Sequence, residues 1–412
     1  MLYIMSENTG SHLVERDHYM DILRDARDSP FIKILTGIRR CGKSTLLSMF
    51  RMELLKSGVP ERRMFRMDFD VDSTDIPHDH RALTDLVESS VEVGPGTYIF
   101  LDEVQNVHEW ERSVASFYTK GADVYITGSN SQMLSSELST KLSGRCLEIY
   151  VMPLVFSEYV RFRKIQDVDR LLDDYIRDGG LPAVALAEDD SSRSIIPQII
   201  EGTFNTLFVK DVIQRHSIRN VQSMMNLFRF MMRNIGDRTS ARNAANCLTS
   251  SGIKTNHVTI EDHIGFLEEA FLVSRARRYN SKTKEYLVTS DKFYSTDLGV
   301  RNNVAGLRYY EDLDGIVENI VYQELRYRYG HVAVLSVDNL EVDFVSDPIH
   351  SPMYWQVSLN ILDENTRERE LRSLKAIPDN YPKTIIIYDR FPMDDIDGIR
   401  VVQLRDWLME GR

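Results

Sequence analysis

The sequence predicts an α/β protein whose N-terminal part contains a parallel β-sheet. Three short runs of apolar residues, at 31–35, 98–101 and 124–126, have the length of buried strands. Helical patterns separate these runs, and polar residues follow each of them directly. Strands joined by helices are parallel, so their carboxyl ends lie at one edge of the sheet. We therefore expect the ligand site at that edge.

Length and composition indicate a soluble globular protein of two to three domains. The chain has 412 residues, of which 42% are hydrophobic and 27% are charged. Its net charge of −12 argues against a surface that binds nucleic acid throughout, but it leaves room for a local basic groove.

Two further features set expectations about the compartment. No stretch approaches the roughly 20 apolar residues of a membrane span, and the start lacks a signal-peptide pattern. Cys41, Cys146 and Cys247 are too widely spaced for a disulfide framework or a metal cluster. We expect a cytoplasmic protein that does not engage a membrane.

The first apolar run is followed by Gly37-Ile-Arg-Arg-Cys-Gly-Lys-Ser44 and then by a helical pattern that continues to Phe50. Glycines let backbone N–H groups surround an anion, and a helix N-terminus adds positive potential. This is the setting of a phosphate-binding loop. We expect Lys43 to reach the β- and γ-phosphates of ATP and Ser44 to bind Mg²⁺. The predicted nucleotide-binding residues are Gly37, Ile38, Arg39, Arg40, Cys41, Gly42, Lys43, Ser44 and Thr45.

An acidic pair, Asp102 and Glu103, emerges at the carboxyl end of the second apolar run. At this edge Asp102 is suited to help bind Mg²⁺, and Glu103 is suited to orient the attacking water. Two further candidates follow along the chain. Asn130 lies at the tip of the third run, where it would contact the γ-phosphate or the water. Arg145 lies on a short loop, where it would stabilise transferred phosphoryl charge either within the chain or from a neighbouring copy.

Six motifs stand in order along the chain and together resemble one protein family. They are Thr36-Gly-Ile-Arg-Arg-Cys-Gly-Lys-Ser-Thr45, Leu101-Asp-Glu-Val-Gln-Asn106, Ile126-Thr-Gly-Ser-Asn130, Leu142-Ser-Gly-Arg145, Pro153-Leu-Val-Phe-Ser-Glu-Tyr159 and Gly179-Gly-Leu-Pro182. The set resembles archaeal and bacterial AAA-type ATPases whose C-terminal domain is of uncharacterised function. The resemblance covers essentially the whole chain. It implies a P-loop core with an additional strand, and it implies no particular substrate.

Changes of pattern along the chain divide it into four expected domains. Residues 1–156 form the P-loop ATPase core, and 157–225 form a helical lid over the nucleotide. Residues 226–288 form a winged-helix-like module, and 289–412 form a C-terminal α/β domain. Within the lid, Lys210, Asp211 and Arg215 are expected to form surface salt bridges, with contact to phosphates as the alternative.

The winged-helix-like module rests on a short helix, Ser240–Cys247, a longer helix, Thr255–Phe271, and a basic hairpin after them. Helix–turn–helix geometry would place the longer helix in a DNA major groove. Glu261, Asp262, Glu268 and Glu269 on that helix would be repelled by phosphates, so contact by the hairpin with the DNA backbone is favoured. A solvated charged face is the alternative. The candidate contacts are Arg275, Arg277, Arg278, Lys282 and Lys284.

The C-terminal order of one helix and several strands resembles the restriction-endonuclease-like fold. In that fold a helix acid, a strand Asp and an acid-x-Lys on the next strand gather Mg²⁺. Glu318 and Asp343 match the first two positions, with Glu341 close by, whereas Gln356 and Ser358 replace the acid and the lysine. A neutral amide is a weaker ligand for a hard cation, so we expect a vestigial nuclease site that does not cleave efficiently.

These features together predict an ATPase that requires Mg²⁺ and acts as a switch. Its nucleotide state, ATP or ADP, would be coupled to a C-terminal module that binds DNA or a protein. Two alternatives stay open at this point. One is a DNA-binding regulator without significant turnover, and the other is an ATP-dependent nuclease that acts through Glu318, Asp343 and Glu341.

Overall fold

The computed structural model describes residues 14–70, 76–131, 142, 144–163, 165, 167–187, 193–287, 290–308 and 311–410. The chain divides into two compact units. The first contains the described residues of Met1–Ile34, Lys43–Thr127 and Leu142–Ile149, and the second contains those of Leu35–Gly42, Gly128–Lys141 and Tyr150–Arg412. No helix in the described part of the chain has the length and apolar character needed to cross a membrane.

A five-stranded sheet with the order β2-β3-β4-β1-β5 forms the N-terminal fold. The β2–β3 and β3–β4 ladders are parallel, and backbone bonds from Ile32 to Arg145 and from Val151 to Thr36 join β1 to β5 in the same direction. The order places β4 between β1 and β3, as expected for a core with an additional strand, so the predicted parallel sheet is confirmed. The strands are β1 (Ile32–Thr36), β2 (Met64–Asp68), β3 (Tyr98–Asp102), β4 (Asp123–Gly128) and β5 (Cys146–Tyr150).

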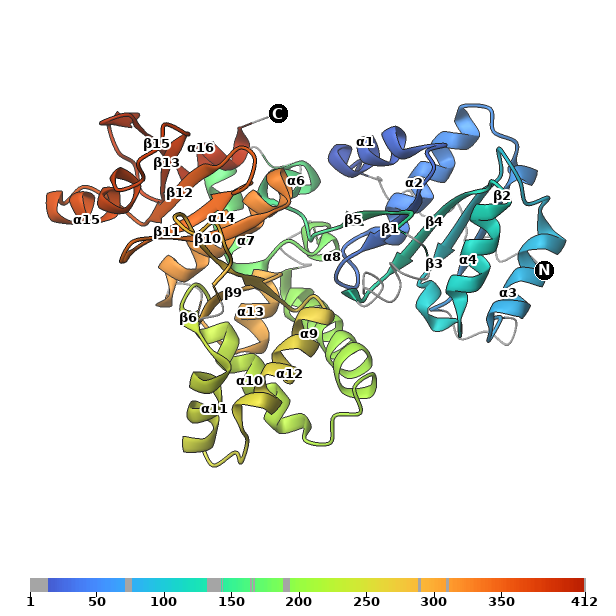
Figure 1. Cartoon of the computed structure of the whole chain (residues 1–412), viewed down its shortest axis with the longest axis horizontal. Helices are drawn as coiled ribbons and strands as arrows, with labels where there is room; N and C mark the ends of the chain where they lie inside the picture. Colours follow the sequence, from blue (N-terminus) through green and yellow to red (C-terminus); the bar gives the residue numbers. More distant parts are fainter. Residues whose placement is uncertain are drawn as a thin grey trace. The chain divides into compact units, whose positions relative to one another are not determined.

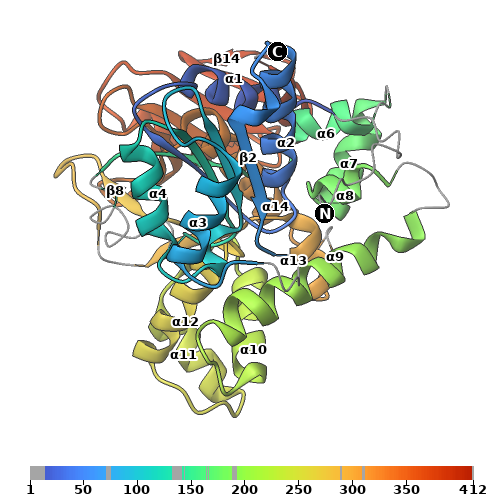
Figure 2. The ribbon, with the colours of Figure 1, turned by 90° about the vertical axis from the view of Figure 1, so that its right-hand side faces the viewer.

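Two pairs of helices accompany this sheet. Helix α1 packs against α2, and α3 packs against α4. The two pairs lie on opposite sides of the strands (Figures 1 and 2). This is expected because β1–α2–β2 crosses the sheet in the opposite direction to the next two crossovers, and such crossovers are right-handed. The helices are α1 (Asp17–Ala26), α2 (Lys43–Lys56), α3 (His80–Ser90) and α4 (Trp110–Thr119).

Helices fill the segment that follows the first sheet. The expected boundary at 225/226 lies inside one of them, α10. The apolar face of α7 buries Leu171, Leu172, Tyr175 and Ile176, as the sequence spacing predicts. The elements are α6 (Phe156–Arg163), α7 (Val168–Asp178), α8 (Pro182–Ala185), α9 (Ile196–Thr206), the π-helix η5 (Leu207–Gln214) and α10 (Val221–Arg233).

A three-stranded antiparallel sheet with the order β6-β9-β7 follows. The expected boundary at 288/289 cuts it, because β9 lies beyond 288 and pairs with both β6 and β7. The strand β8, which follows β7 in the chain, does not join this sheet. It pairs in parallel with β10 of the C-terminal sheet. The elements are β6 (Arg238–Thr239), α11 (Ala241–Ser250), α12 (His257–Glu269), β7 (Val273–Ala276), β8 (Arg278–Asn280) and β9 (Asp291–Ser295).

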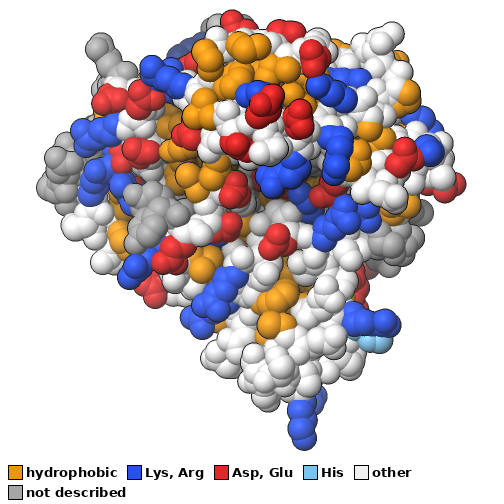
Figure 3. Space-filling view, turned by 90° about the vertical axis from the view of Figure 1, so that its left-hand side faces the viewer, with side chains coloured by type: hydrophobic (Ala, Val, Ile, Leu, Met, Phe, Trp, Pro, Cys, Tyr) orange, Lys and Arg blue, Asp and Glu red, His pale blue; other side chains and the backbone are white. Residues whose placement is uncertain are grey.

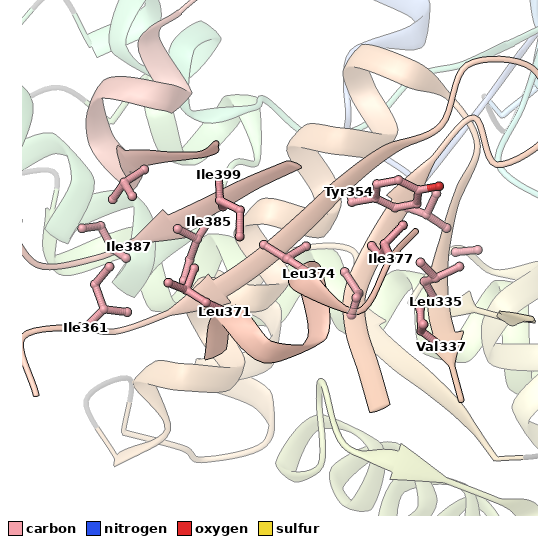
Figure 4. Close-up of a cluster of buried hydrophobic side chains, with 14 of the residues drawn as sticks. Leu335, Val337, Tyr354, Ile361, Leu371, Leu374, Ile377, Ile385, Ile387 and Ile399 are labelled. Carbon is pink, nitrogen blue, oxygen red and sulfur yellow. The ribbon is translucent and has the colours of Figure 1, made fainter. Parts of the chain in front are cut away.

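The C-terminal sheet has seven strands in the order β14-β15-β13-β12-β11-β10-β8. Its apolar core lies between the strands and α15, where Leu371 and Leu374 face Ile385 and Leu335 (Figure 4). The elements are α13 (Leu298–Val304), α14 (Leu313–Tyr329), β10 (Val332–Val337), β11 (Leu340–Ser346), β12 (Met353–Ser358), α15 (Glu364–Lys375), β13 (Lys383–Ile387), β14 (Asp395–Ile396), β15 (Ile399–Gln403) and α16 (Leu404–Met409).

The Gly179-Gly180 motif has a packing role in the second unit. The N–H of Leu154 donates to the Gly180 carbonyl at 2.7 Å, and the Gly180 N–H donates to the Asp297 carboxylate at 2.8 Å. A Cβ at Gly180 would lie 2.2 Å from the Leu154 carbonyl oxygen. Only glycine therefore allows the three chain segments to meet this closely.

We predict that Gly180→Ala lowers the free energy of unfolding by about 1 to 3 kcal/mol, because the methyl group collides with backbone that cannot move aside. Gly202→Ala is the matched control, since nothing lies within 4 Å of a Cβ at this position in α9. We expect it to leave stability unchanged or to raise it by about 1 kcal/mol. Denaturant titrations of both variants would measure the difference, and equal stabilities would contradict this packing role.

Candidate functional site

Two carboxylates and a threonine meet where β3 and β4 end. Asp102 is the last residue of β3, and Glu103 follows it in the left-handed conformation with φ 54° and ψ 42°. The Thr127 hydroxyl of β4 donates a short hydrogen bond to Asp102 and accepts the Glu103 N–H at 2.9 Å. A non-glycine residue in this conformation is uncommon and is seen at functional sites. Thr127 thus fixes both acids in place.

The first turn of α2 faces these acids. The Nζ of Lys43 lies 3.7 Å from Oε1 of Glu103, and both side chains are almost fully buried. The other Glu103 oxygen accepts a hydrogen bond from Gln105 at 2.5 Å. Ser44 donates its hydroxyl to Asp102. The pairing that the sequence predicted between the start of the helix and the strand acids is therefore present within the first unit.

Burial raises the pKa of Asp102 above its ordinary value, and the charges of Asp68 and Glu103 add to this rise. Hydrogen bonds from Thr127 and Ser44 oppose it. A buried carboxylate beside two other acids favours a nearby cation, and Mg²⁺ prefers oxygen ligands such as this carboxylate and the Ser44 hydroxyl. The residues present therefore fit a magnesium ion.

The loop Gly37–Gly42 has contacts within the second unit. A Cβ at Gly37 would lie 2.1 Å from the Val151 carbonyl oxygen, to which the Cys41 thiol donates at 3.2 Å. Cys41 is thus a buried packing residue. Gly37 and Gly42 have φ of 142° and 105°, values that favour glycine.

The two arginines of this loop contact the helical segment that follows the first sheet. The Arg39 Nε donates to the Asp211 carboxylate at 2.7 Å, and Arg40 donates to the Thr203 hydroxyl at 3.3 Å. Asp211 is 1% exposed. The expectation that Asp211 forms a surface salt bridge was therefore wrong, because Asp211 is buried against the loop.

The remaining predicted residues of this region have different surroundings. Asn130 is buried after β4. Beside it, the buried hydroxyls of Ser129 and Thr36 have no hydrogen-bond partner among the described residues. Arg145 is exposed, and its guanidinium lies over the Tyr118 ring of α4 at 5.3 Å. Its predicted role in phosphoryl transfer stays a prediction.

A second group of acids gathers in the C-terminal part around a lysine that the sequence reasoning missed. The Nζ of Lys292, on β9, lies 2.7 Å from Glu318, 3.3 Å from Glu341 and 3.5 Å from Asp343. Lys292 is 5% exposed. The predicted acids of α14 and β11 do come together, and a buried ammonium group lies between them.

Gln356, the fourth predicted residue, joins the same group. Its carbonyl oxygen accepts the Asp343 N–H at 3.4 Å, and its amide donates to Glu370 at 3.0 Å. A cavity of about 140 Å³ lies beside these side chains. It is lined by Asp314, Glu318, Asp343, Gln356, Ser358 and Glu370, among others. Within the described ranges, no group of three or more His, Cys, Asp or Glu residues is arranged to hold a metal ion.

Burial and neighbouring charges together shift the pKa values in this group. Burial raises the pKa of Asp343 to about 7, and Glu318 adds to the rise whereas Lys292 opposes it. Burial lowers the pKa of Lys292, but the three carboxylates outweigh this and raise it above its ordinary value. The lysine therefore remains charged and offsets part of the negative charge of the three acids.

Three of the five basic residues proposed to contact nucleic acid are paired within the protein. Arg275 binds Glu268 at 2.8 Å and Glu261 at 2.9 Å. Lys282 forms a close ion pair with Asp338, and Arg278 lies 3.9 Å from Glu341. β8, which lies in this hairpin, also pairs with β10 of the C-terminal sheet. The hairpin therefore has a structural role. Arg277 and Lys284 are exposed.

Comparison with known proteins identifies two regions of the chain. Residues 29–160 match the model of an AAA domain, and residues 169–311 match that of a domain of unknown function, DUF8612. The second model runs through both expected boundaries, at 225/226 and 288/289. The nuclease-like assignment of the C-terminal domain has no support from these models.

An uncharacterised protein of Haemophilus influenzae is 31% identical over 404 residues, which cover 97% of this chain and 99% of that protein. The chain belongs to the family of this protein. An uncharacterised protein of Methanocaldococcus jannaschii, MJ1544, is 27% identical over 409 residues, which cover 91% of this chain and 88% of the relative.

A solved structure supports the fold of this AAA-domain protein. The Walker-type ATPase PABY2304 of Pyrococcus abyssi superimposes with a TM-score of 0.51 and 13% identity, over 71% of this chain and 96% of that one. With the AAA model, it shows that the N-terminal region has the fold of an AAA-type P-loop ATPase.

We predict that Lys292→Met lowers the free energy of unfolding at pH 8 by about 3 to 5 kcal/mol, because three acids lose their buried counter-charge. Lowering the pH should recover part of this loss. In the parent, burial raises the pKa of Asp343 to about 7 and Lys292 opposes this rise, so the loss of Lys292 raises that pKa further. The folded variant therefore takes up its proton at a higher pH than the folded parent, and this uptake removes one of the unpaired charges.

Denaturant titrations at pH 8 and pH 6 would measure both effects. Lys282→Met is the matched control, since the Lys282 side chain is 72% exposed although it also pairs with an acid. We expect this control to change stability by about 1 kcal/mol or less. A Lys292→Met protein as stable as the parent at pH 8 would contradict the neutralising role of the lysine.

Proposed function

We propose that this protein hydrolyses ATP and uses the nucleotide state as a switch for its C-terminal module. The single observation that carries the proposal is the meeting of Lys43 and Ser44, at the start of α2, with the acids Asp102 and Glu103 at the end of β3. A phosphate-binding loop leads directly into that helix. Positioning and electrostatic stabilisation are what phosphoryl transfer requires of a protein.

Each side chain has a role in this proposal. The N–H groups of the loop and the Lys43 ammonium hold the phosphates. Glu103 accepts a hydrogen bond from water and aims it at the γ-phosphorus, so that ATP and water give ADP and phosphate. Thr127 holds Glu103 and Asp102 in position through its two hydrogen bonds. Mg²⁺, held by Ser44 and Asp102, would supply positive charge to the phosphate oxygens.

We predict that Glu103→Gln slows ATP hydrolysis by about 10² to 10⁴-fold and leaves nucleotide affinity nearly unchanged, because the amide cannot accept the proton of the attacking water. Phosphate release and the binding of a fluorescent ATP analogue would measure the two effects. Glu109→Gln is the control, since Glu109 is also in the left-handed conformation but pairs with Arg112 at 3.0 Å. Unchanged turnover in Glu103→Gln would refute the assigned role, and slow parental turnover would favour a regulator without hydrolysis.

We also propose that the DUF8612 region presents a winged-helix-like surface to nucleic acid. The order α10, β6, α11, α12, β7, β9 and the antiparallel sheet β6-β9-β7 support this reading. Residues 238–260 contain no Asp or Glu, although the chain has 62 of them. The end formed by α11 is mostly uncharged or blue in Figure 3. Arg242 and Lys254 are exposed. Phosphates would be attracted there and not to the paired hairpin.

The nuclease alternative is disfavoured by the position of Lys292. An ammonium group already lies among Glu318, Glu341 and Asp343, and Gln356 offers only a neutral oxygen. These residues do not fit a divalent metal, so we propose that the domain does not cleave nucleic acid.

One gel experiment tests both proposals about nucleic acid. With supercoiled plasmid and Mn²⁺ at low salt, we expect slower migration without nicking, because the cationic face binds phosphates and no metal site cuts them. Replacing Arg242 and Lys254 by Ala should abolish the shift, whereas replacing the exposed Arg372 and Lys375 of α15 should not. Nicking that disappears in Asp343→Ala would establish a nuclease. No shift at low salt would point to a protein partner.

A further inference from the structure

The phosphate-binding loop is attached to the DUF8612 region by its own arginines. Arg39 donates to Asp211 in η5 at 2.7 Å, and Arg40 donates to Thr203 in α9 at 3.3 Å. Both partners lie about 160 residues or more along the chain, outside the matched AAA region. The loop that would hold the nucleotide therefore contacts a helix of another part of the protein.

Burial makes the pair between Arg39 and Asp211 strong. Arg39 is 9% exposed and Asp211 is 1% exposed, so water screens their attraction poorly. Removing one partner of such a pair leaves an uncompensated buried charge. A movement of Arg39 away from Asp211 would therefore change the electrostatic environment of this carboxylate.

Asp211 is shared between two cations. Its other oxygen lies 3.2 Å from the Arg215 guanidinium, one turn further along the same helix. The phosphates of a nucleotide attract the guanidinium of Arg39, and Arg215 can still neutralise Asp211 if Arg39 turns toward them. The structure shows the carboxylate bound to both cations, and its contact with Arg215 would remain within the helix if Arg39 moved.

The backbone on both sides of the pair has an uncommon conformation. Asp211 lies in the eight-residue π-helix η5, whereas π-helices normally occur as single turns and often at functional sites. Arg40, next to Arg39, has a φ of 63°. Segments in such conformations persist only because their surroundings hold them, so a change in one contact can shift them.

We propose that Asp211 is a positioning residue for the phosphate-binding loop, and that it transmits nucleotide occupancy to the helix α9–η5. This inference rests on the proposed function, since it requires that the loop binds nucleotide. Under this proposal, the DUF8612 region responds to nucleotide bound at the loop. The ligand is the phosphate chain of a nucleoside di- or triphosphate, and the responding element is residues 196–214.

Hydrogen exchange of the full-length protein tests the proposal. In the parent we expect ADP, or a non-hydrolysable ATP analogue, to change the exchange of residues 196–214 by about tenfold. In Asp211→Asn we expect this change to disappear while a fluorescent nucleotide still binds. Asp211→Glu, which keeps the charge, should restore the change.

Asp174→Asn is the matched control. Asp174 is 3% exposed and binds Arg177 at 2.7 Å in the same unit, without a contact to the loop among its ion pairs. We expect this variant to keep the nucleotide-dependent exchange of 196–214 even though it loses a buried ion pair. The control separates a general loss of stability from a loss of coupling.

The outcomes distinguish this inference from the function beneath it. If the parent does not bind nucleotide, the proposed function fails. If the parent binds nucleotide and residues 196–214 do not respond, or if Asp211→Asn responds as the parent does, the coupling through Asp211 is refuted. Where Asp211→Asn does not fold, the measurement on the parent can still refute the coupling, and the comparison with Asp211→Glu tests the part played by the carboxylate.

Discussion

The buried carboxylate of Asp297 is the interaction on which the second unit depends. It accepts the N–H groups of Gly180 at 2.8 Å and Val300 at 2.9 Å, and so joins α8 to α13 across more than a hundred residues of chain. Burial raises its pKa to about 6 even though these donors lower it. A carboxylate in such a place is tolerated only with this many partners. The glycines of both segments are required because any side chain would push the donors away.

The same principle recurs at each junction of the second unit. Arg39 meets Asp211, and Lys292 meets the acids of α14 and β11, in places with little water. Replacing a buried ion pair by apolar side chains is often neutral or stabilising, so such pairs contribute little net stability. Their effect here is on arrangement, because a buried cation is stable only where an anionic group lies close to it. The loop, the helices and the C-terminal sheet are therefore placed by polar contacts as well as by apolar packing.

The sequence was sufficient to predict those elements that depend on residues close together in the chain. The strand before Gly37, the helix after Gly42 and the acids after β3 follow from short patterns, because consecutive residues determine them. Thr127 and Lys292 were missed as site residues, and Asp211 was expected at the surface, since each acts on groups far away in the chain. A polar residue in a buried strand, such as Thr127 or Lys292, was the available signal. Strand pairing is likewise invisible to local patterns: β8 and β9 follow one another along the chain but pair with different sheets.

The attachment of the loop outside the AAA domain bears on what nucleotide binding can achieve. A ligand shifts a conformational equilibrium only by the difference between its affinities for the two states. A loop held solely by its own sheet would offer the phosphates one state to bind, and their binding energy would stay within the domain. Under the proposal above, Arg39 exchanges Asp211 for the phosphates, and the loop then has two states that differ where the charge of the phosphates acts. The buried pair would then be the feature that makes the proposed switch possible.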